Sequence, residues 1–132
     1  MNVRFFDRGD DTNPLNGSTI RNNDRLLEIV RGIHSRGPSF CELLGQNGYK
    51  LDIGIGPSCG CVQYGLANGD PPYLMAVGQN PMSTNHYEGF LYQNTATEVP
   101  ARYCMPVETV LEIVGAFLDT GQRSSIVAWE EI

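Results

Sequence analysis

Two cysteines and a His-x-Glu pair are the residues of this sequence whose types could form a metal centre. Cys59 and Cys61 are separated by one residue, and His86 lies two positions before Glu88. Zinc deaminases use His-x-Glu to supply a ligand and a general acid/base, and Pro-Cys-x-x-Cys follows it in the chain. Here the cysteines come first and their spacing is one residue too short. We therefore predict no metal or cofactor, and we keep a small metal-binding or enzymatic domain using these four residues as the alternative.

Other catalytic patterns fail on their context. A cysteine nucleophile needs a low pKa and a positioned base, and nothing in the sequence brings His34 or His86 to a thiol. The Gly-x-Gly-x-x-x-Gly pattern at residues 54–60 follows a strand but precedes no helix, so it does not predict a phosphate-binding loop. The adjacent acids Asp10-Asp11 and Glu130-Glu131 cannot face each other across a cleft. We predict no catalytic residues and no enzyme, and we expect these glycines to form turns.

Two amphipathic helices are predicted, at residues 23–36 and 106–120. Asn22 or Asn23 can cap the first helix, which Gly37-Pro38 ends. Pro106 suits the first position of the second helix, and Gly121 suits a left-handed turn at its end. Apolar residues recur at helical spacing on one side of each helix. They are Leu26, Leu27, Ile29, Val30 and Ile33 in the first, and Val107, Val110, Leu111, Val114, Phe117 and Leu118 in the second.

Between the helices the apolar residues alternate with a period of two, which is typical of a strand with one buried face. The turn-separated segments are 51–55, 61–64, 73–77, 88–92 and 99–105, and a last strand is expected at 125–129. The connections are too short for helical crossovers. The prediction is an α+β fold: a single antiparallel meander sheet with both helices packed on one face and the other face open. Residues 1–132 form one domain, in which residues 1–22 are a strand plus a polar loop and residues 23–132 the core.

Composition and charge exclude several classes of function. The 132 residues carry a net charge of −6, and the acidity lies in residues 37–132, where three basic residues face ten acids. An acidic body disfavours direct nucleic-acid binding and suits a basic protein partner. No apolar run approaches the length of about 20 residues that spans a bilayer, so no membrane partner is expected. The N-terminus lacks a signal-peptide pattern, which favours the cytoplasm and reduced, buried cysteines.

Surface chemistry for recognition remains. Tyrosines and one tryptophan lie on or beside the predicted strands, interleaved with acids. These aromatic side chains supply large, rigid contact areas, and acids can pair with the cations of a basic partner. The same aromatic residues can equally belong to the core. The open sheet face is where we expect function.

The motifs of the second half resemble a known family. They are the segments 51–56 (LDIGIG) and 60–64 (GCVQY), the helix that closes on 117–123 (FLDTGQR), and 126–130 (IVAWE). In this order they resemble the first-described family of immunity proteins of bacterial polymorphic toxin systems, usually paired with deaminase-type toxins. The likeness covers residues 40–132. Ser124 stands where that pattern leads us to expect a proline.

The resemblance implies a cognate toxin domain as partner, with a nucleic-acid deaminase as the expected type. The immunity protein would bind the toxin in the producing cell or a sister cell and occlude its active site. Acidic and aromatic residues at strand ends and turns are the predicted toxin contacts, although Trp129 can equally be a core residue. The predicted contacts are Asp70, Tyr73, Tyr87, Glu88, Tyr92, Trp129 and Glu130.

Overall fold

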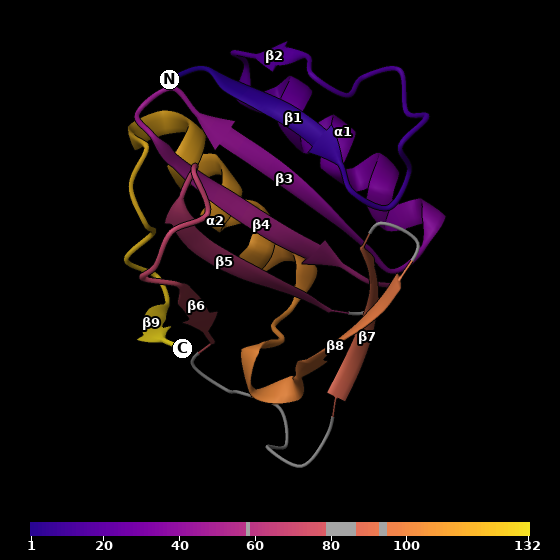
Figure 1. Cartoon of the computed structure of the whole chain (residues 1–132), viewed down its shortest axis with the longest axis vertical. Coiled ribbons are helices and arrows are strands. Elements are labelled where there is room, and N and C mark those ends of the chain that lie inside the picture. Colours follow the sequence, from indigo (N-terminus) through magenta and orange to yellow (C-terminus); the bar gives the residue numbers. More distant parts are fainter. Residues whose placement is uncertain (58, 79–86, 93–94) are drawn as a thin grey trace.

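The computed structural model describes residues 1–57, 59–78, 87–92 and 95–132, and these form one sheet with two helices (Figure 1). The path of paired strands runs β2-β1-β3-β4-β5-β6-β9, and the hairpin β7–β8 joins it through β3. The strands are β1 (Val3–Asp7), β2 (Thr19–Ile20), β3 (Ser39–Gly45), β4 (Tyr49–Ile55), β5 (Gly60–Leu66), β6 (Leu74–Val77), β7 (Tyr87–Tyr92), β8 (Thr95–Pro100) and β9 (Ala128–Glu131). The predicted α+β class and the antiparallel meander β3–β4–β5–β6 are confirmed.

Both helices lie behind the sheet in Figure 1 and cover the same face. The first, α1 (Asn23–Arg36), begins where the side chain of Asn22 accepts a hydrogen bond from the backbone of Arg25 and ends before Gly37, as predicted. The second, α2 (Val107–Thr120), ends at Gly121, whose φ of 73° is the left-handed conformation expected from the sequence. Their apolar sides form the main core with the inward-facing residues of the strands, including Phe5, Leu43, Leu51, Ile53 and Val62.

The opposite face of the sheet carries no helix and is covered only in part. Hairpin β7–β8 crosses its lower right side in Figure 1 and pairs with β3 through Ser39 and Leu91, in parallel orientation. Phe90 and Val99 of this hairpin form a second, smaller apolar cluster with residues of the sheet. The remaining members are Cys59, Cys61, Met75, Tyr103 and Cys104, with Phe40 and Val77 packed against them. The helix-free face is therefore divided into a covered corner and an open centre.

Two predicted strand boundaries were wrong. The segment predicted as a strand at 99–105 ends its pairing at Pro100 and continues as a 3-10 helix, η1 (Ala101–Tyr103). Proline lacks the N–H that the next ladder bond would require. The last strand begins at Ala128 and not at residue 125, because Ser124 forms a local turn in which its Oγ accepts a hydrogen bond from the backbone of Ile126.

Gly54 lies inside β4, in the strand predicted at residues 51–55, and not in a turn. A Cβ at this position would lie 2.7 Å from Sγ of Cys61, 3.1 Å from Phe40 and 3.2 Å from Phe90. The absence of a side chain lets the two phenyl rings, whose centroids are 5.5 Å apart, pack directly on the sheet. Gly54 thus allows hairpin β7–β8 to dock.

Gly54→Ala is expected to lower the free energy of unfolding by about 1–3 kcal/mol, because the added methyl group overpacks this contact. Urea unfolding measures the change. Gly89→Ala is the matched control, since a Cβ at the exposed Gly89 of β7 would meet no atom within 4 Å. Equal stability of the two variants would contradict the docking role of Gly54.

Candidate functional site

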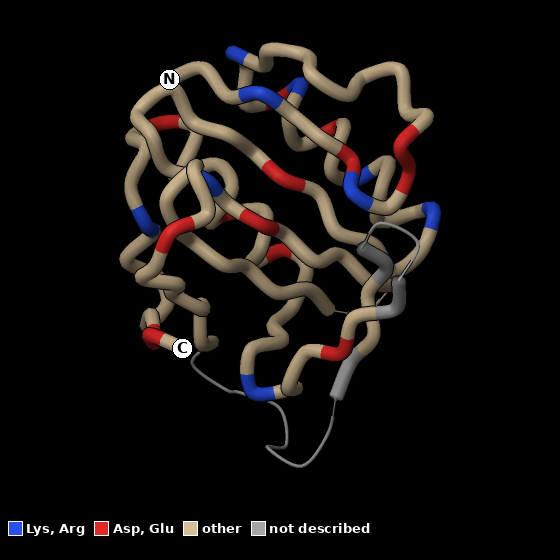
Figure 2. The backbone as a smooth tube through the Cα atoms, viewed as in Figure 1, with Lys and Arg blue, Asp and Glu red and all other residues tan. Residues whose placement is uncertain are grey.

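One row of side chains crosses the helix-free face from β1 to β9. The strand register places the row residues opposite one another, and alternation along each strand directs them away from the helices. They are Phe6, Glu42, Asp52, Gln63, Met75 and Glu130. Figure 2 shows acidic positions on β3 and β4 in the middle of this face. We call this surface the row face; it is the candidate functional site.

A compact charged network occupies the centre of the row face. Glu42 and Asp52 are directly opposite on β3 and β4, and Nζ of Lys50 lies 3.2 Å from Oε2 of Glu42 and 3.4 Å from Oδ2 of Asp52. Arg8 donates to Oε1 of Glu42 over 2.8 Å. Glu42 is almost fully buried, at 5% exposure. Its two cationic partners compensate for the loss of hydration.

The pKa values of the two carboxyl groups in this network are shifted in opposite directions. Burial raises the pKa of Asp52 to about 6; Lys50 lowers that pKa, but the negative charge of Glu42 raises it. Burial also acts to raise the pKa of Glu42, but hydrogen bonds from Arg8 and from protonated Asp52 hold that pKa below its usual range. Asp52 is therefore the group of this pair that takes up the proton in mildly acidic solution.

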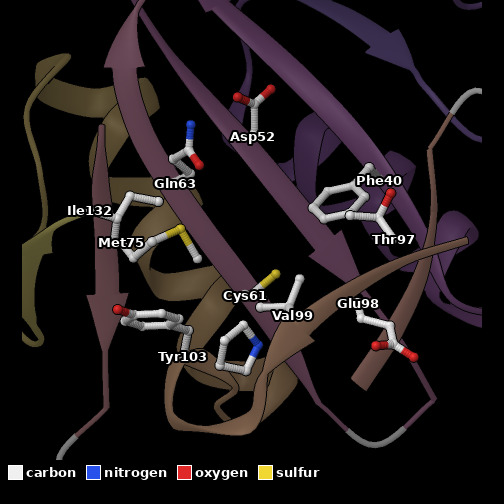
Figure 3. A pocket seen from close by; sticks show the side chains of 11 residues that line it. Phe40, Asp52, Cys61, Gln63, Met75, Thr97, Glu98, Val99, Tyr103 and Ile132 are labelled. Carbon is white, nitrogen blue, oxygen red and sulfur yellow. The ribbon is translucent and has the colours of Figure 1, made fainter. Parts of the chain in front are cut away.

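Asp52 also lines a cavity of about 220 Å³ (Figure 3). The cavity lies between the sheet and strand β8, and Phe40, Met75, Val99 and Tyr103 supply most of its apolar wall. Its remaining lining residues are Cys61, Gln63, Thr97, Glu98, Pro100 and Ile132. Within the described part of the chain, Oδ1 of Asp52 is buried and has no hydrogen-bond partner. An ionised oxygen in this position is costly unless a donor is supplied.

Glu130 continues the row on β9 and is held by the 3-10 helix. Arg102 binds Oε2 of Glu130, and the hydroxyl of Tyr103 donates to its Oε1 over 3.1 Å. Because Tyr103 also lines the cavity, these contacts join the C-terminal strand to the cavity wall. The carboxylate is partly exposed, at 39%, and remains accessible to a partner.

The structure separates the predicted toxin contacts. Glu130 lies on the row face. Tyr73 directly precedes β6, and its hydroxyl donates to the carbonyl of Gly69 over 2.7 Å. Asp70 is exposed in the turn between β5 and β6, where its backbone N–H donates to the side chain of Asn68. For Tyr87, Glu88 and Tyr92 only the backbone in β7 is described.

Trp129 lies on the other side of β9, toward the helices. Its ring is edge-on to that of Tyr64 at 6.1 Å, and its Nε1–H donates to the carbonyl of Ser124 over 2.9 Å. It packs against the main core. The half-buried indole therefore has a structural role in attaching the last strand.

The residues of the metal-site alternative are only partly described. Cys59 and Cys61 are buried in the second apolar cluster, and burial raises the pKa of the Cys61 thiol well above its usual range. All four cysteines are buried, and among the described residues none forms a disulfide. Within the described residues, no three histidine, cysteine or acidic side chains gather as metal ligands. His86 lies outside the described residues, as does the side chain of Glu88.

Sequence reasoning did not select Glu42, Lys50 and Asp52 as a group. Lys50 and Asp52 occupy alternate positions of β4 and therefore lie on the same face of the sheet. Glu42, which lies opposite Asp52 on the neighbouring strand, could not be predicted as its partner, because the sequence does not reveal the pairing register of β3 with β4. Two charged residues at alternate positions of a strand were the available signal.

The chain matches the model of one protein family, described as Immunity protein Imm1, over residues 12–131. The chain belongs to the Imm1 family of immunity proteins. A comparison with curated proteins gives no match. In the described part of this Imm1 protein, no helix is long and apolar enough to cross a membrane.

The motif at residues 117–123 has a structural role in this Imm1 protein. The carbonyl of Gly121 accepts hydrogen bonds from Nδ2 of Asn47 over 2.9 Å and from the hydroxyl of Tyr64 over 3.4 Å. Arg123 stacks over the ring of Tyr64 at 5.7 Å. Ser124, the departure from the expected proline, supports the turn into β9. These contacts connect the end of α2 to the sheet and lie away from the row face.

Asp52→Asn is expected to stabilise the protein by about 1–3 kcal/mol at pH 8 and to have little effect near pH 4. A carboxyl group whose pKa is raised in the folded state favours folding while it is protonated, and this contribution is lost as the pH rises through about 6. Urea unfolding from pH 4 to pH 8 measures the difference. Asp119→Asn, at an exposed position of α2, is the matched control. If Asp52→Asn were no more stable than the unmodified protein at pH 8, ionisation of Asp52 would not destabilise the fold.

Proposed function

We propose that this protein binds a cognate toxin domain through the row face and neutralises it by covering its active site, without chemistry of its own. The family supplies the immunity role. The observation that supports the choice of surface is the position of Asp52 beside an apolar cavity: its Oδ1 is buried and has no hydrogen-bond partner among the described residues. Groups that lack partners in the free protein and lie in a hollow are typical of binding sites.

The charge of the protein supports a basic partner. The chain carries a net charge of −6, so its field attracts a positively charged surface over a distance of about one Debye length. A toxin that acts on nucleic acid needs a basic substrate groove to hold phosphates. An acidic protein seated in that groove competes directly with the substrate. We therefore propose a nucleic-acid deaminase as the toxin type.

The composition of the row face supports an interface more than an enzyme centre. It combines exposed polar groups at its margin with apolar surface at the cavity, which is the usual anatomy of a recognition site. Cys41 and Cys61 are poor nucleophiles, because burial raises the pKa of both thiols well above the ordinary value. These features favour inhibition by binding over a catalytic role.

Co-expression with the toxin domain encoded beside the gene tests the immunity role. Survival of the host and a stable one-to-one complex are the expected results. A catalytically inactive toxin allows the complex to be purified and its affinity measured. Growth arrest despite expression, with no complex, would refute the proposed pairing.

Glu130→Gln is expected to weaken toxin binding about tenfold or more, because it removes a carboxylate of the row face and leaves Arg102 as an uncompensated cation toward a basic partner. Titration calorimetry at two salt concentrations measures the affinity. Glu131→Gln is the matched control: it is the same change one residue along β9, where the side chain points to the other face. Equal losses in the two variants would place the toxin elsewhere.

A further inference from the structure

The cavity beside Asp52 has the lining that an arginine side chain requires. Its volume of about 220 Å³ exceeds the roughly 150 Å³ of engineered cavities that admit benzene. Phe40 and Tyr103 present aromatic rings and Met75 an apolar wall, against which the methylene stem and the planar guanidinium can pack. Asp52 and Gln63 supply oxygen acceptors.

The charges around the cavity favour a cation. Glu42, Asp52 and Glu98 contribute three negative charges, whereas Lys50 and Arg8 contribute two positive ones; Glu130 is compensated by Arg102. Among the described residues, this leaves one carboxylate in excess. An incoming cation restores the balance and can supply the donor that Oδ1 of Asp52 lacks.

Other ligand classes fit this lining less well. An anion would meet the excess negative charge, and a purely apolar ligand would leave the Asp52 oxygen buried without a donor. A lysine would provide the charge, but its compact ammonium does not stack on aromatic rings as a planar guanidinium does.

We propose that this cavity is a subsite for an arginine side chain of the toxin, held by Asp52 and stacked against Phe40. The inference rests on the proposed function and deepens it, because it names the chemical group that the row face recognises. The arginine takes the place of the proton that Asp52 otherwise shares with Glu42. Binding is therefore expected to weaken as the solution becomes acidic, with Lys50, Arg8 and Glu98 as the other charged groups in this environment.

A capped arginine, N-acetyl-arginine-N-methylamide, tests the subsite without any toxin. NMR titration of the full chain is expected to show saturable shifts at the cavity residues, with a Kd on the order of 1–10 mM. The capped citrulline, a neutral isostere, is expected to bind at least about tenfold more weakly, since it lacks the charge. A capped lysine is expected to bind more weakly than the arginine.

Three variants decide whether the shifts come from this site. Asp52→Asn is expected to weaken binding of the capped arginine at least about tenfold, and Asp119→Asn to leave it unchanged. Thr97→Tyr, at an exposed position of the cavity rim, is expected to block entry while β8 keeps a residue suited to a strand. Thermal unfolding confirms that each variant is folded before binding is compared.

The outcomes separate the subsite from the proposed function. The subsite is overturned if the capped arginine causes no saturable shift, if the capped citrulline binds as tightly as the arginine, or if Asp52→Asn binds the arginine as tightly as the unmodified protein. Each of these results holds even if the protein neutralises its toxin. If the protein binds the capped arginine but does not neutralise the toxin, the cavity is an arginine subsite and the proposed function is refuted. With a toxin in hand, Asp52→Asn must weaken the complex at pH 8 although its own fold is stabilised, and an unchanged affinity overturns the inference.

Discussion

Both helices pack on the same face of one sheet, and this constraint divides the residues of every central strand between two environments. In β4, Leu51 and Ile53 are fully buried under the helices, whereas Lys50 and Asp52 point to the opposite side. The same alternation brings Glu42 opposite Asp52 and Glu130 into line with Met75. The row face is thus a geometric consequence of the helix packing. A one-residue slip of β3 or β4 would turn Glu42, or Lys50 and Asp52, toward the core.

The hairpin β7–β8 adds a cavity to this face of the sheet. Without it, the charged network around Lys50 would be an ordinary solvated patch on a sheet. Packing of Phe90 over Gly54 brings β8 across the sheet, and the space left beside Asp52 becomes a cavity. The same packing reduces the hydration of the carboxyl group, which raises its pKa. Shape and electrostatics at this site therefore have one structural cause.

Much of the fold could be predicted from the sequence, because its signals are local. The two helices have capping residues and apolar stripes, and the strands of the meander are short and separated by turn residues. These patterns predicted the types of the elements and the packing of both helices on one face of the sheet. The candidate site depends on contacts between distant segments. Glu42 meets Asp52 only through the register of β3 with β4, and Tyr103 reaches Glu130 only because the chain turns after Pro100. Neither arrangement has a local sequence pattern. Trp129 shows the converse: its type suited either an interface or the core, and the structure shows its ring packed against Tyr64.

The family motif and the candidate site occupy different parts of the molecule, and this separation has a physical explanation. Gly121, Arg123 and Ser124 connect α2 to the sheet and to β9, so substitutions there would disturb the position of the last strand and with it the fold. Residues of the row face contact solvent and the cavity, and many can change without loss of the core. An inhibitor that must match one toxin needs such freedom at its interface, because specificity is a difference in affinity between partners. The family match therefore identifies the scaffold, whereas the proposed binding site rests on Asp52, whose Oδ1 is buried without a hydrogen-bond partner among the described residues.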